Sequence, residues 1–334
     1  MRLAAIDSAP RGSRIEVGPG VYSQQITIKK NGITLVGKGA KLEPPETFVD
    51  NECTRFAGDL PEPLGPTQAG ICVTGGDLSL DEYQAEHRKV NSVGKPVKDV
   101  TITGFTVSGF LGFNILVLGA ENANVYGNTL ENGPVYGFLT AGSRNTRVTD
   151  NKISSAVPGF NFVALCMDNF SKVKVSHNRI SDYFVGLCVQ TDGADVEENE
   201  VSNVCYGAFV DPGVQGARVR NNHITGVNPI CESFGGVAGG VQMSGSIGTK
   251  VEGNYIEGFS GAQAAGVGIV DELCQFPSLG CIKFGPPPII AKDNRVKGNT
   301  FGVNPLDIFL GAPGNGNVVK NNDCDISVPP ELCA

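Results

Sequence analysis

The sequence contains no tryptophan, three histidines and few charged residues, which make up 18% of its 334 residues. No uninterrupted apolar stretch approaches the roughly 20 residues that a membrane-spanning helix needs, so we expect no membrane partner. Asp and Glu outnumber Lys and Arg by 34 to 26, which gives a formal net charge of −8. Because nucleic-acid-binding proteins usually carry a basic surface, this composition predicts no nucleic-acid partner.

Cys-x-x-Cys pairs, which are typical of zinc sites, are also missing, although the sequence has ten cysteines. An even number of cysteines in a chain of this size favours disulfides and an oxidising compartment. The expected pairs are Cys53–Cys72, Cys205–Cys231, Cys274–Cys281 and Cys324–Cys333. The residues after Met1 lack the apolar core of a signal peptide. The alternatives are a cytoplasmic protein and a secreted protein whose leader has been removed, and the cysteines favour secretion.

A Val-x-x-Asn pattern recurs from the middle of the sequence to its end. Its eight copies are Val125/Asn128, Val148/Asn151, Val175/Asn178, Val196/Asn199, Val219/Asn222, Val251/Asn254, Val296/Asn299 and Val319/Asn322. In seven of them an apolar residue follows two positions after the Asn. A repeat of this period is typical of a solenoid. We expect an inward Val to end one strand, Asn to form the corner in the left-handed conformation that it tolerates, and stacked Asn side chains to hydrogen-bond along a ladder.

A second set of short strands precedes these units. They cover residues 136–141, 163–168, 185–190, 206–211, 239–244 and 265–270. Because side chains alternate across a strand, one set of residues is predicted to face the core. The set is Leu165, Met167, Leu187, Val189, Ala208, Val210, Val241 and Met243. A column of small residues from Gly137 to Gly266 is expected to leave a flat trough on the outside.

The two ends of the chain and two Pro-rich stretches complete the expected organisation. Residues 2–9 resemble the last turns of an amphipathic helix that caps the first coil, as a solenoid requires. Residues 43–97 are interpreted as a lateral loop insertion, and residues 274–292 as a Pro-rich loop excursion. Neither stretch is expected to form a separate domain, so a single domain over residues 1–334 is predicted.

The segment from Pro10 to Tyr22 (PRGSRIEVGPGVY) resembles the opening of the pectate-lyase-like, NosD-type β-helix superfamily, as do Ile26–Ile28 and Gly32–Gly39. The repeats over residues 100–327 continue this resemblance. It implies an all-β fold, a single-stranded right-handed parallel β-helix of roughly ten rungs with a short N-terminal capping helix. Members of the superfamily include pectate lyases, polygalacturonases, pectin methylesterases, alginate epimerases and phage tailspikes.

The sequence departs from the catalytic motifs of these enzymes. The Asn-Thr-Asp, Asp-Asp, Gly-His-Gly and Arg-Ile-Lys blocks of polygalacturonases are missing, and so are the motif contexts of pectin methylesterases. The segment from Tyr206 to Pro212 is only loosely similar to the Tyr-Gly-x-Asp-Pro-His motif of mannuronan epimerases, and no His follows it. The resemblance therefore implies the fold and leaves the reaction open.

The resemblance places a substrate groove along the sheet that contains the second set of strands. There the outward column at the strand ends contains Asp168, Gln190 and Asp211. At a spacing of ~4.8 Å per strand the two carboxylates are expected ~9–10 Å apart, a separation near that of inverting glycosidases. Asp168 and Asp211 are therefore the candidate catalytic pair, with Asp192 in an adjacent loop. The alternative is that these polar residues only cap strand ends.

The neighbouring positions supply the candidate substrate-binding and metal-binding residues. Besides Gln190, the candidate substrate-binding residues are Phe209, Tyr206, Gln242 and Ser244. The two aromatic rings are expected to stack on a sugar or to shield the core. Asp192 and Asp271 are candidate ligands for Ca²⁺, the one cofactor considered, and otherwise none is expected. Cys166 and Cys188 are expected to stack on adjacent rungs at a disulfide separation.

These patterns together predict a secreted, monomeric carbohydrate-active enzyme. Its substrate would be a polysaccharide or oligosaccharide, which it would cleave by hydrolysis or by lyase chemistry in a groove on this sheet. One alternative is a non-catalytic β-helix that binds glycans or displays loops. Another is an isomerase or lyase of small-molecule metabolism, for which a closed pocket under residues 43–97 is expected.

Overall fold

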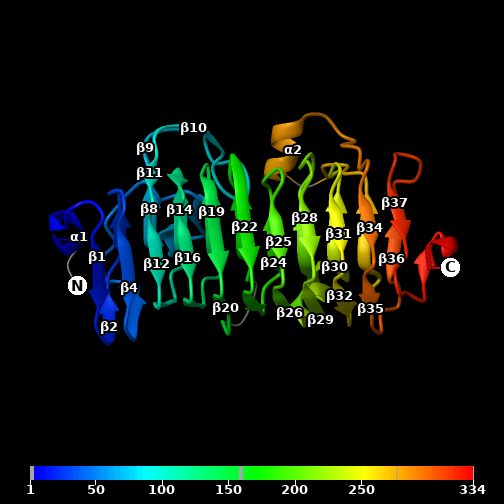
Figure 1. Ribbon diagram of the computed structural model, residues 1–334, viewed down its shortest axis with the longest axis horizontal. Coiled ribbons are helices and arrows are strands. Elements are labelled where there is room, and N and C mark those ends of the chain that lie inside the picture. Colours follow the sequence, from blue (N-terminus) through cyan, green and yellow to red (C-terminus); the bar gives the residue numbers. More distant parts are fainter. Residues whose placement is uncertain (1–3, 158–160, 276, 334) are drawn as a thin grey trace. The chain divides into compact units, whose positions relative to one another are not determined.

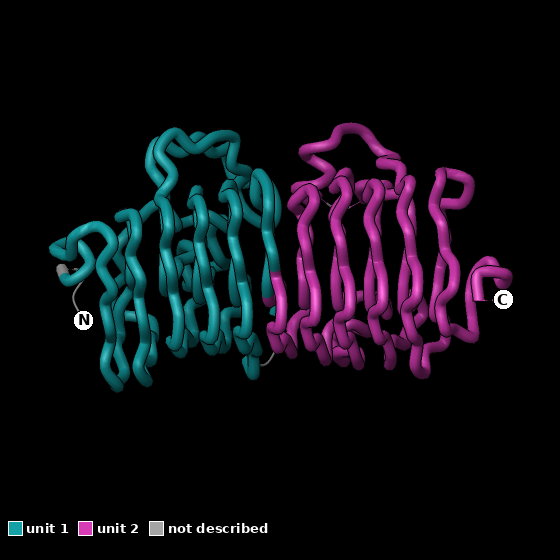
Figure 2. The backbone as a smooth tube through the Cα atoms, viewed as in Figure 1, with its two compact units in different colours: residues 1–161, 165–174 teal, residues 162–164, 175–334 magenta. Residues whose placement is uncertain are grey.

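Short strands wind into coils in this protein, as the repeat predicts. The computed structural model describes residues 4–157, 161–275 and 277–333, and its strands form parallel ladders that coil around an apolar core (Figure 1). Contacts between Cα atoms divide the chain into two compact units. Unit 1 contains residues 1–161 and 165–174, and unit 2 contains residues 162–164 and 175–334 (Figure 2).

Each coil of unit 1 contributes one strand to each of three parallel sheets, which we name sheets A, B and C. Sheet A has the order β1 (Arg14–Val17), β4 (Thr34–Gly37), β12 (Thr101–Thr103), β16 (Asn124–Tyr126) and β19 (Arg144–Thr149). Sheet B has the order β2 (Gly20–Ser23), β5 (Ala40–Glu43), β13 (Thr106–Ser108), β17 (Thr129–Glu131) and β20 (Lys152–Ser154). Sheet C has the order β3 (Ile26–Ile28), β8 (Ala69–Thr74), β14 (Phe113–Leu118) and β18 (Tyr136–Ala141). The strands β21 (Val163–Asp168) and β22 (Ser171–Ser176) each contain residues of both units.

Unit 2 repeats the same three sheets. Sheet A continues as β25 (Asp195–Glu197), β28 (Arg218–Arg220), β31 (Lys250–Glu252), β34 (Arg295–Lys297) and β37 (Val318–Lys320). Sheet B contains β23 (Arg179–Ser181), β26 (Glu200–Val204), β29 (His223–Val227), β32 (Tyr255–Glu257) and β35 (Thr300–Phe301). Sheet C contains β24 (Val185–Val189), β27 (Tyr206–Val210), β30 (Val237–Ser244), β33 (Gln263–Val270), β36 (Ile308–Leu310) and β38 (Ser327–Val328).

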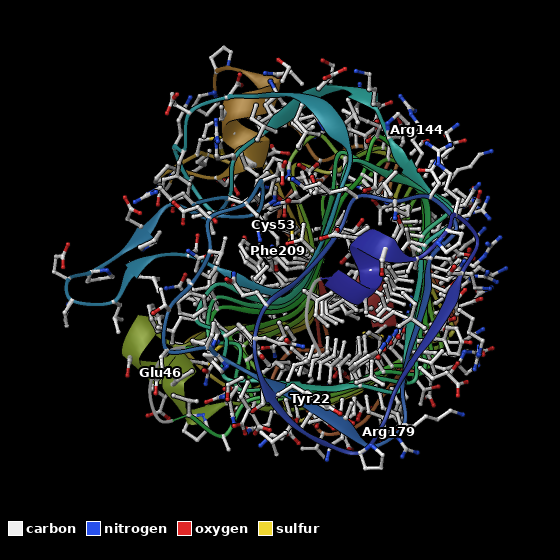
Figure 3. All side chains as sticks on the ribbon, turned by 90° about the vertical axis from the view of Figure 1, so that its left-hand side faces the viewer. Tyr22, Glu46, Cys53, Arg144, Arg179 and Phe209 are labelled. Carbon is white, nitrogen blue, oxygen red and sulfur yellow. A yellow bond between two sulfur atoms is a disulfide. The ribbon has the colours of Figure 1, made fainter. Side chains whose placement is uncertain are left out.

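The interior of the coils is a stack of aliphatic side chains, which the view along the coil shows pointing inward (Figure 3). All eight residues predicted to face the core from sheet C are fully buried. The Val of the repeat is at most 2% exposed in every copy except Val319, which is half-exposed in the last coil. The predicted alternation is therefore confirmed over most of the chain.

The predicted asparagine ladder lies between sheets A and B. In unit 2 the Nδ2 of Asn199 donates to Oδ1 of Asn222 at 2.9 Å, and Asn222 donates to Asn254 at 2.9 Å. The same Oδ1 atoms also accept the backbone N–H of the preceding ladder residue. The prediction about the backbone was wrong, however. The positive φ belongs to the residue before each ladder Asn, such as Glu198 and Asn221, so the amide side chain serves hydrogen bonding and not the bend.

The small residues of sheet C do not form the flat outer trough that the sequence predicts, so this prediction was wrong. A Cβ on Gly207 would clash with Cγ2 of Ile224 in sheet B, and a Cβ on Gly240 would clash with Cγ2 of Ile256. These glycines therefore face the interior, where the bend from sheet B into sheet C leaves no room for a side chain.

The N-terminal end follows the prediction, and the single-domain organisation stays a prediction. Helix α1 (Ala4–Ser8) caps the first coil with the buried Ile6, and Nζ of Lys30 donates to the carbonyls of Asp7 at 2.6 Å and Ala9 at 2.7 Å. Residues 43–97 differ in one respect, since they include β8, a strand of sheet C. The remainder includes the antiparallel pairs β6 (Asp59–Leu60) with β7 (Gly65–Pro66) and β9 (Gly76–Leu80) with β10 (Val90–Lys95).

Smaller elements complete the description. Two short strands, β11 (Val97–Lys98) and β15 (Ala120–Glu121), pair beside sheet A. The helices are η1 (Pro229–Phe234), α2 (Leu279–Phe284) in the second excursion, and η2 (Pro330–Cys333). None of the described helices is long and apolar enough to cross a bilayer.

All four disulfides predicted from the cysteine spacing are present, namely Cys53–Cys72, Cys205–Cys231, Cys274–Cys281 and Cys324–Cys333. Cys166 and Cys188 are disulfide-bonded as well. No cysteine in the described ranges is free.

Candidate functional site

The candidate site lies on the outer face of sheet C in unit 2. Strand register places Phe209 of β27 beside Gln242 of β30, and Gln242 beside Gly268 of β33. A Cβ on Gly268 would clash with Oε1 of Gln242. Gly268 therefore gives the amide of Gln242 room to lie across the face, where an amide both donates and accepts hydrogen bonds.

Four aromatic rings gather on this face, and we name them the aromatic cluster: Phe184, Tyr206, Phe209 and Phe234. Tyr206 contacts Phe209 edge-on with ring centroids 5.3 Å apart, and Phe184 contacts Phe234 at 5.0 Å. Phe234 ends η1 and is 45% exposed, while the other three rings are half-buried. Such edge-to-face packing holds aromatic rings in defined positions, so the cluster offers a fixed apolar surface.

Local covalent and hydrogen-bonded structure positions Phe234. The Cys205–Cys231 disulfide ties η1 to the residue before β27. The side chain of Asn228 caps η1 by accepting the N–H of Ile230 at 3.0 Å, and Gly235 ends it with a φ of 81°. Phe234 is therefore held beside β27 and remains open to solvent.

The carboxylate of Glu272 lies at the end of β30, close enough for its charge to act on Tyr206 of the aromatic cluster. Oγ of Ser244 donates to Oε2 of Glu272 at 2.5 Å, and the N–H of Cys274 donates to Oε1 of Glu272 at 2.6 Å. Burial, together with the negative charge of Glu272, raises the pKa of Tyr206 to about 12. The phenol of Tyr206 is therefore protonated at neutral pH, and it can donate a hydrogen bond.

The segment around α2 contacts the residues that follow β27. A Cβ on Gly213 would clash with the ring of Phe284, and a Cβ on Gly280 would lie 2.6 Å from Cδ of Pro212. The segment around α2 thus packs on the turn that follows β27. Asp211, just before Pro212, is only 4% exposed.

The structure brings some of the predicted residues together. Nε2 of Gln190 donates to Oδ2 of Asp211 at 2.8 Å, and both side chains are buried. Asp192 is exposed, and its Oδ1 accepts the N–H of Gln215 at 2.8 Å, which shapes a turn. Asp168 is half-buried and belongs to unit 1, whereas Asp211 belongs to unit 2. The catalytic pairing of Asp168 with Asp211 therefore stays a prediction.

Three residues of the candidate site were not predicted from the sequence: Phe184, Phe234 and Glu272. A signal for Phe234 was present, because the predicted Cys205–Cys231 disulfide already places residue 231 beside β27. Glu272 had no such signal. Its position depends on how the second excursion folds back onto the coils.

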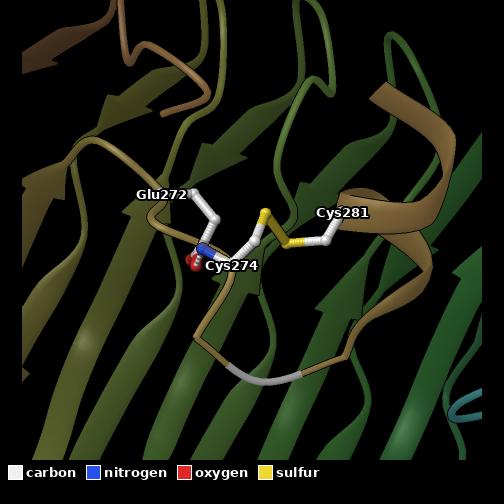
Figure 4. A group of neighbouring side chains, drawn as sticks. All are labelled: Glu272, Cys274 and Cys281. Atoms are coloured by element: carbon white, nitrogen blue, oxygen red, sulfur yellow. Dashed lines mark hydrogen bonds between the residues drawn. A yellow bond between two sulfur atoms is a disulfide. The ribbon is translucent and has the colours of Figure 1, made fainter. Parts of the chain in front are cut away.

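The described residues offer one group of potential metal ligands, formed by Glu272, Cys274 and Cys281 (Figure 4). The two sulfur atoms are bonded to each other, so neither is a thiolate that could bind a metal. Oδ1 of Asp271, a predicted Ca²⁺ ligand, accepts the N–H of Ala291 at 2.8 Å. The Ca²⁺ site at Asp271 stays a prediction.

A cleft of about 620 Å³ lies in unit 1 under the loop at residues 45–51. Gln25 lines it, but its Oε1 accepts the N–H of Val49 and its Nε2 donates to Oε1 of Gln68 at 3.1 Å. Nδ2 of Asn51 donates to Oγ1 of Thr27 at 3.1 Å. These polar groups hold the loop onto β3 and β8, so they explain the structure of the insertion without a ligand.

Comparison with known proteins agrees with this architecture. The family model described as "Right handed beta helix region" matches residues 20–182 and 163–328. No curated protein matches the sequence.

Solved structures are similar in fold at low sequence identity. The tailspike protein of Escherichia coli bacteriophage HK620, as a double mutant in complex with a pentasaccharide, is 17% identical with a TM-score of 0.58, and the match covers 97% of this chain and 58% of the tailspike. The DFA-IIIase from Arthrobacter chlorophenolicus A6 without its lid is 12% identical with a TM-score of 0.55, and covers 92% and 83% of the two chains. The Dettilon tailspike protein is 13% identical with a TM-score of 0.51 and covers 94% of this chain. The chain spans 59% of the length of the Dettilon tailspike.

Proposed function

Because the chain belongs to the right-handed β-helix family, we propose that it is a carbohydrate-active protein that binds a polysaccharide or oligosaccharide on the outer face of sheet C in unit 2. The aromatic cluster is the observation that carries this proposal. A family match alone would not be sufficient, because one fold supports many functions.

The chemistry of the face suits a sugar ring. A pyranose presents an apolar C–H face and a rim of hydroxyl groups, so it needs a flat apolar surface with polar groups at its edge. Phe209 and Phe234 supply the apolar surface. The phenol of Tyr206 and the amide of Gln242 supply donors, and Glu272 is an acceptor.

The similar structures support a glycan as the class of ligand. The HK620 tailspike holds a pentasaccharide, which demonstrates that a β-helix can bind an oligosaccharide. At 17% identity the tailspike supports the choice of ligand class only and no individual contact.

We further propose that the bound glycan is cleaved, with the exposed carboxylate of Asp192 in unit 2 as the first candidate. Asp211 would act through Gln190, because its own carboxylate is buried. Hydrolysis is favoured over lyase chemistry at Tyr206, since a phenol whose pKa is about 12 is a poor base at neutral pH. Ca²⁺ at Asp271 belongs to this same proposal.

We place the protein outside the cell as a monomer. The disulfides, with no free cysteine among the described residues, suit an oxidising compartment. Polysaccharides are also found there.

The proposal is tested by measuring binding to a panel of neutral and acidic polysaccharides, with reducing ends and unsaturated products assayed in parallel. Phe234→Ala should weaken the binding found at least about tenfold, as expected for an exposed aromatic anchor. Tyr126→Ala is the control, because Tyr126 is similarly exposed at 42% but lies in sheet A of unit 1.

Two outcomes would contradict the proposal. Equal affinities of the wild type and the Phe234→Ala variant would exclude the aromatic cluster as the binding surface. If Phe234→Ala weakens binding but no product forms, the protein binds glycans without cleaving them. If product does form, Asp192→Asn tests catalysis, since it should lower product formation without altering binding.

A further inference from the structure

The outer face of sheet A in unit 2 carries a column of basic residues, one on each of three adjacent strands. Arg218 of β28 is in register with Lys250 of β31, and Lys250 is in register with Arg295 of β34. All three are exposed. These strands lie side by side in Figure 1, and neighbouring positions in a parallel sheet are ~4.8 Å apart. We name this set the basic column.

The next outward position extends the positive charge. Lys297 of β34 is in register with Lys320 of β37, and both are exposed. Glu252 is the acidic residue at this position on β31. Apart from Arg220, the outward positions of β28, β31, β34 and β37 thus hold five basic residues and only one acidic residue. The net charge of the whole chain, in contrast, is −8.

Within the described part of the protein the basic column forms no ion pair, although Asp195 of β25 is in register with Arg218, because the Asp195 carboxylate pairs with Arg220. Among the residues that the structure describes, no ion pair involves Arg218, Lys250 or Arg295. Arg220 is different, because it contacts Asp195 at 3.0 Å and Glu197 at 2.7 Å. Carboxylates of β25 therefore neutralise Arg220, whereas no such ion pair forms at Arg218, Lys250 or Arg295.

Like charges directly opposite each other on adjacent strands destabilise a sheet. The inward residues of the same strands, Val219, Val251 and Val296, are fully buried and follow the ordinary pattern. Repulsion that lowers the stability of the sheet, and that no neighbouring residue offsets, is expected at functional positions. A polyanion that runs across the strands would compensate for this repulsion.

We propose that the basic column binds an acidic polysaccharide, with the chain of sugars crossing β28, β31 and β34 so that successive anionic groups meet successive basic side chains. The guanidinium groups of Arg218 and Arg295 suit the planar, two-point recognition of carboxylates. A carboxylated and a sulfated glycan share this chemistry.

A nucleic acid fits this surface less well. The face is a flat sheet, whereas proteins read duplexes with elements that enter a groove. Single strands are usually held by aromatic side chains that stack on bases, and the aligned positions of β28, β31, β34 and β37 contain none.

The experiment compares the wild type with the triple variant Arg218→Glu/Lys250→Glu/Arg295→Glu. Binding is measured to polygalacturonate, heparin, neutral dextran, single-stranded DNA and vesicles of anionic phospholipid. The control is Arg11→Glu/Lys38→Glu/Lys152→Glu, which changes the net charge equally at three exposed positions of unit 1. Thermal unfolding of both variants establishes that they fold.

The proposal predicts that the wild type binds polygalacturonate, heparin or both, and does not bind dextran through this face. The triple variant should bind at least about tenfold more weakly than the wild type, as expected for the loss of three exposed ion pairs. The control should keep the wild-type affinity. Binding should disappear near 1 M salt, where the Debye length is about 3 Å. The relative affinity for the two glycans distinguishes carboxylated from sulfated ligands.

The proposal is overturned if the control weakens binding as much as the triple variant, which would indicate a general charge effect. Tighter binding of DNA or of vesicles than of either glycan would also overturn it. Phe234→Ala separates this face from the proposed glycan site on sheet C. A loss of affinity that follows Phe234→Ala and not the triple variant would support the sheet C site and refute the basic column.

Discussion

Replacing Asn222 by Ala tests the hydrogen-bonding role of the ladder directly. Asn222 is 1% exposed, and its Oδ1 accepts both the backbone N–H of Asn199 at 3.0 Å and Nδ2 of Asn199 at 2.9 Å. Its Nδ2 donates to the carbonyl of Val196 at 3.1 Å. Truncation leaves the N–H of Asn199 buried without this acceptor and shortens the ladder by one member.

The magnitude follows from the number of buried groups that lose a partner. Each such group costs about 1–3 kcal/mol, and at least the N–H of Asn199 and one further donor are affected. Asn222→Ala should therefore lower the free energy of unfolding by about 2–6 kcal/mol. Urea unfolding with the disulfides intact measures this loss, and hydrogen exchange at the amide of Asn199 should become faster.

The neighbouring residue provides the control. Asn221 has a φ of 54° and is exposed, so Asn221→Gly should change stability by less than about 0.5 kcal/mol. Asn222→Gly should be as damaging as Asn222→Ala, since the ladder position does not require a left-handed backbone. Rescue of stability by glycine at position 222, or slow exchange at Asn199 in the alanine variant, would refute the hydrogen-bonding explanation.

Two further predictions concern the bend into sheet C and the buried tyrosine. Gly207→Ala should destabilise the protein by about 3 kcal/mol or more in the same urea assay, because the new methyl group has no room. Gly18→Ala, whose Cβ would meet nothing within 4 Å, should be neutral, and equal effects of the two would contradict the packing argument. The raised pKa of Tyr206, about 12 against an ordinary value near 10, means that the folded protein holds this proton more tightly. Its contribution to stability is complete below pH 10 and is lost as pH rises toward 12. Ultraviolet titration of the wild type and of Tyr206→Phe should therefore agree up to about pH 11, and a difference between them near pH 10 would refute the shift.

The similarity of consecutive coils explains why the fold was predictable. Inward and outward positions of a strand alternate, so Leu187 and Val189 could be assigned to the core from local sequence alone. The Asn ladder followed from one repeated residue at one repeated place. The left-handed conformation was predicted at the ladder residue Asn222, whereas the structure has it at the preceding residue, Asn221. Both residues are asparagines, which tolerate this conformation, so residue type alone does not distinguish them.

The sequence by itself determined the β-helix, its aliphatic core, the asparagine ladder and four disulfides, because each depends on a pattern that repeats from coil to coil or on cysteines that are near in sequence. Only the tertiary structure decided which polar residues are accessible. Asp211 is buried beside Gln190, and Glu272 reaches Ser244 because the chain folds back onto the coils after β33. Such non-repeating loops contact residues distant in sequence, and local periodicity contains no information about where they pack.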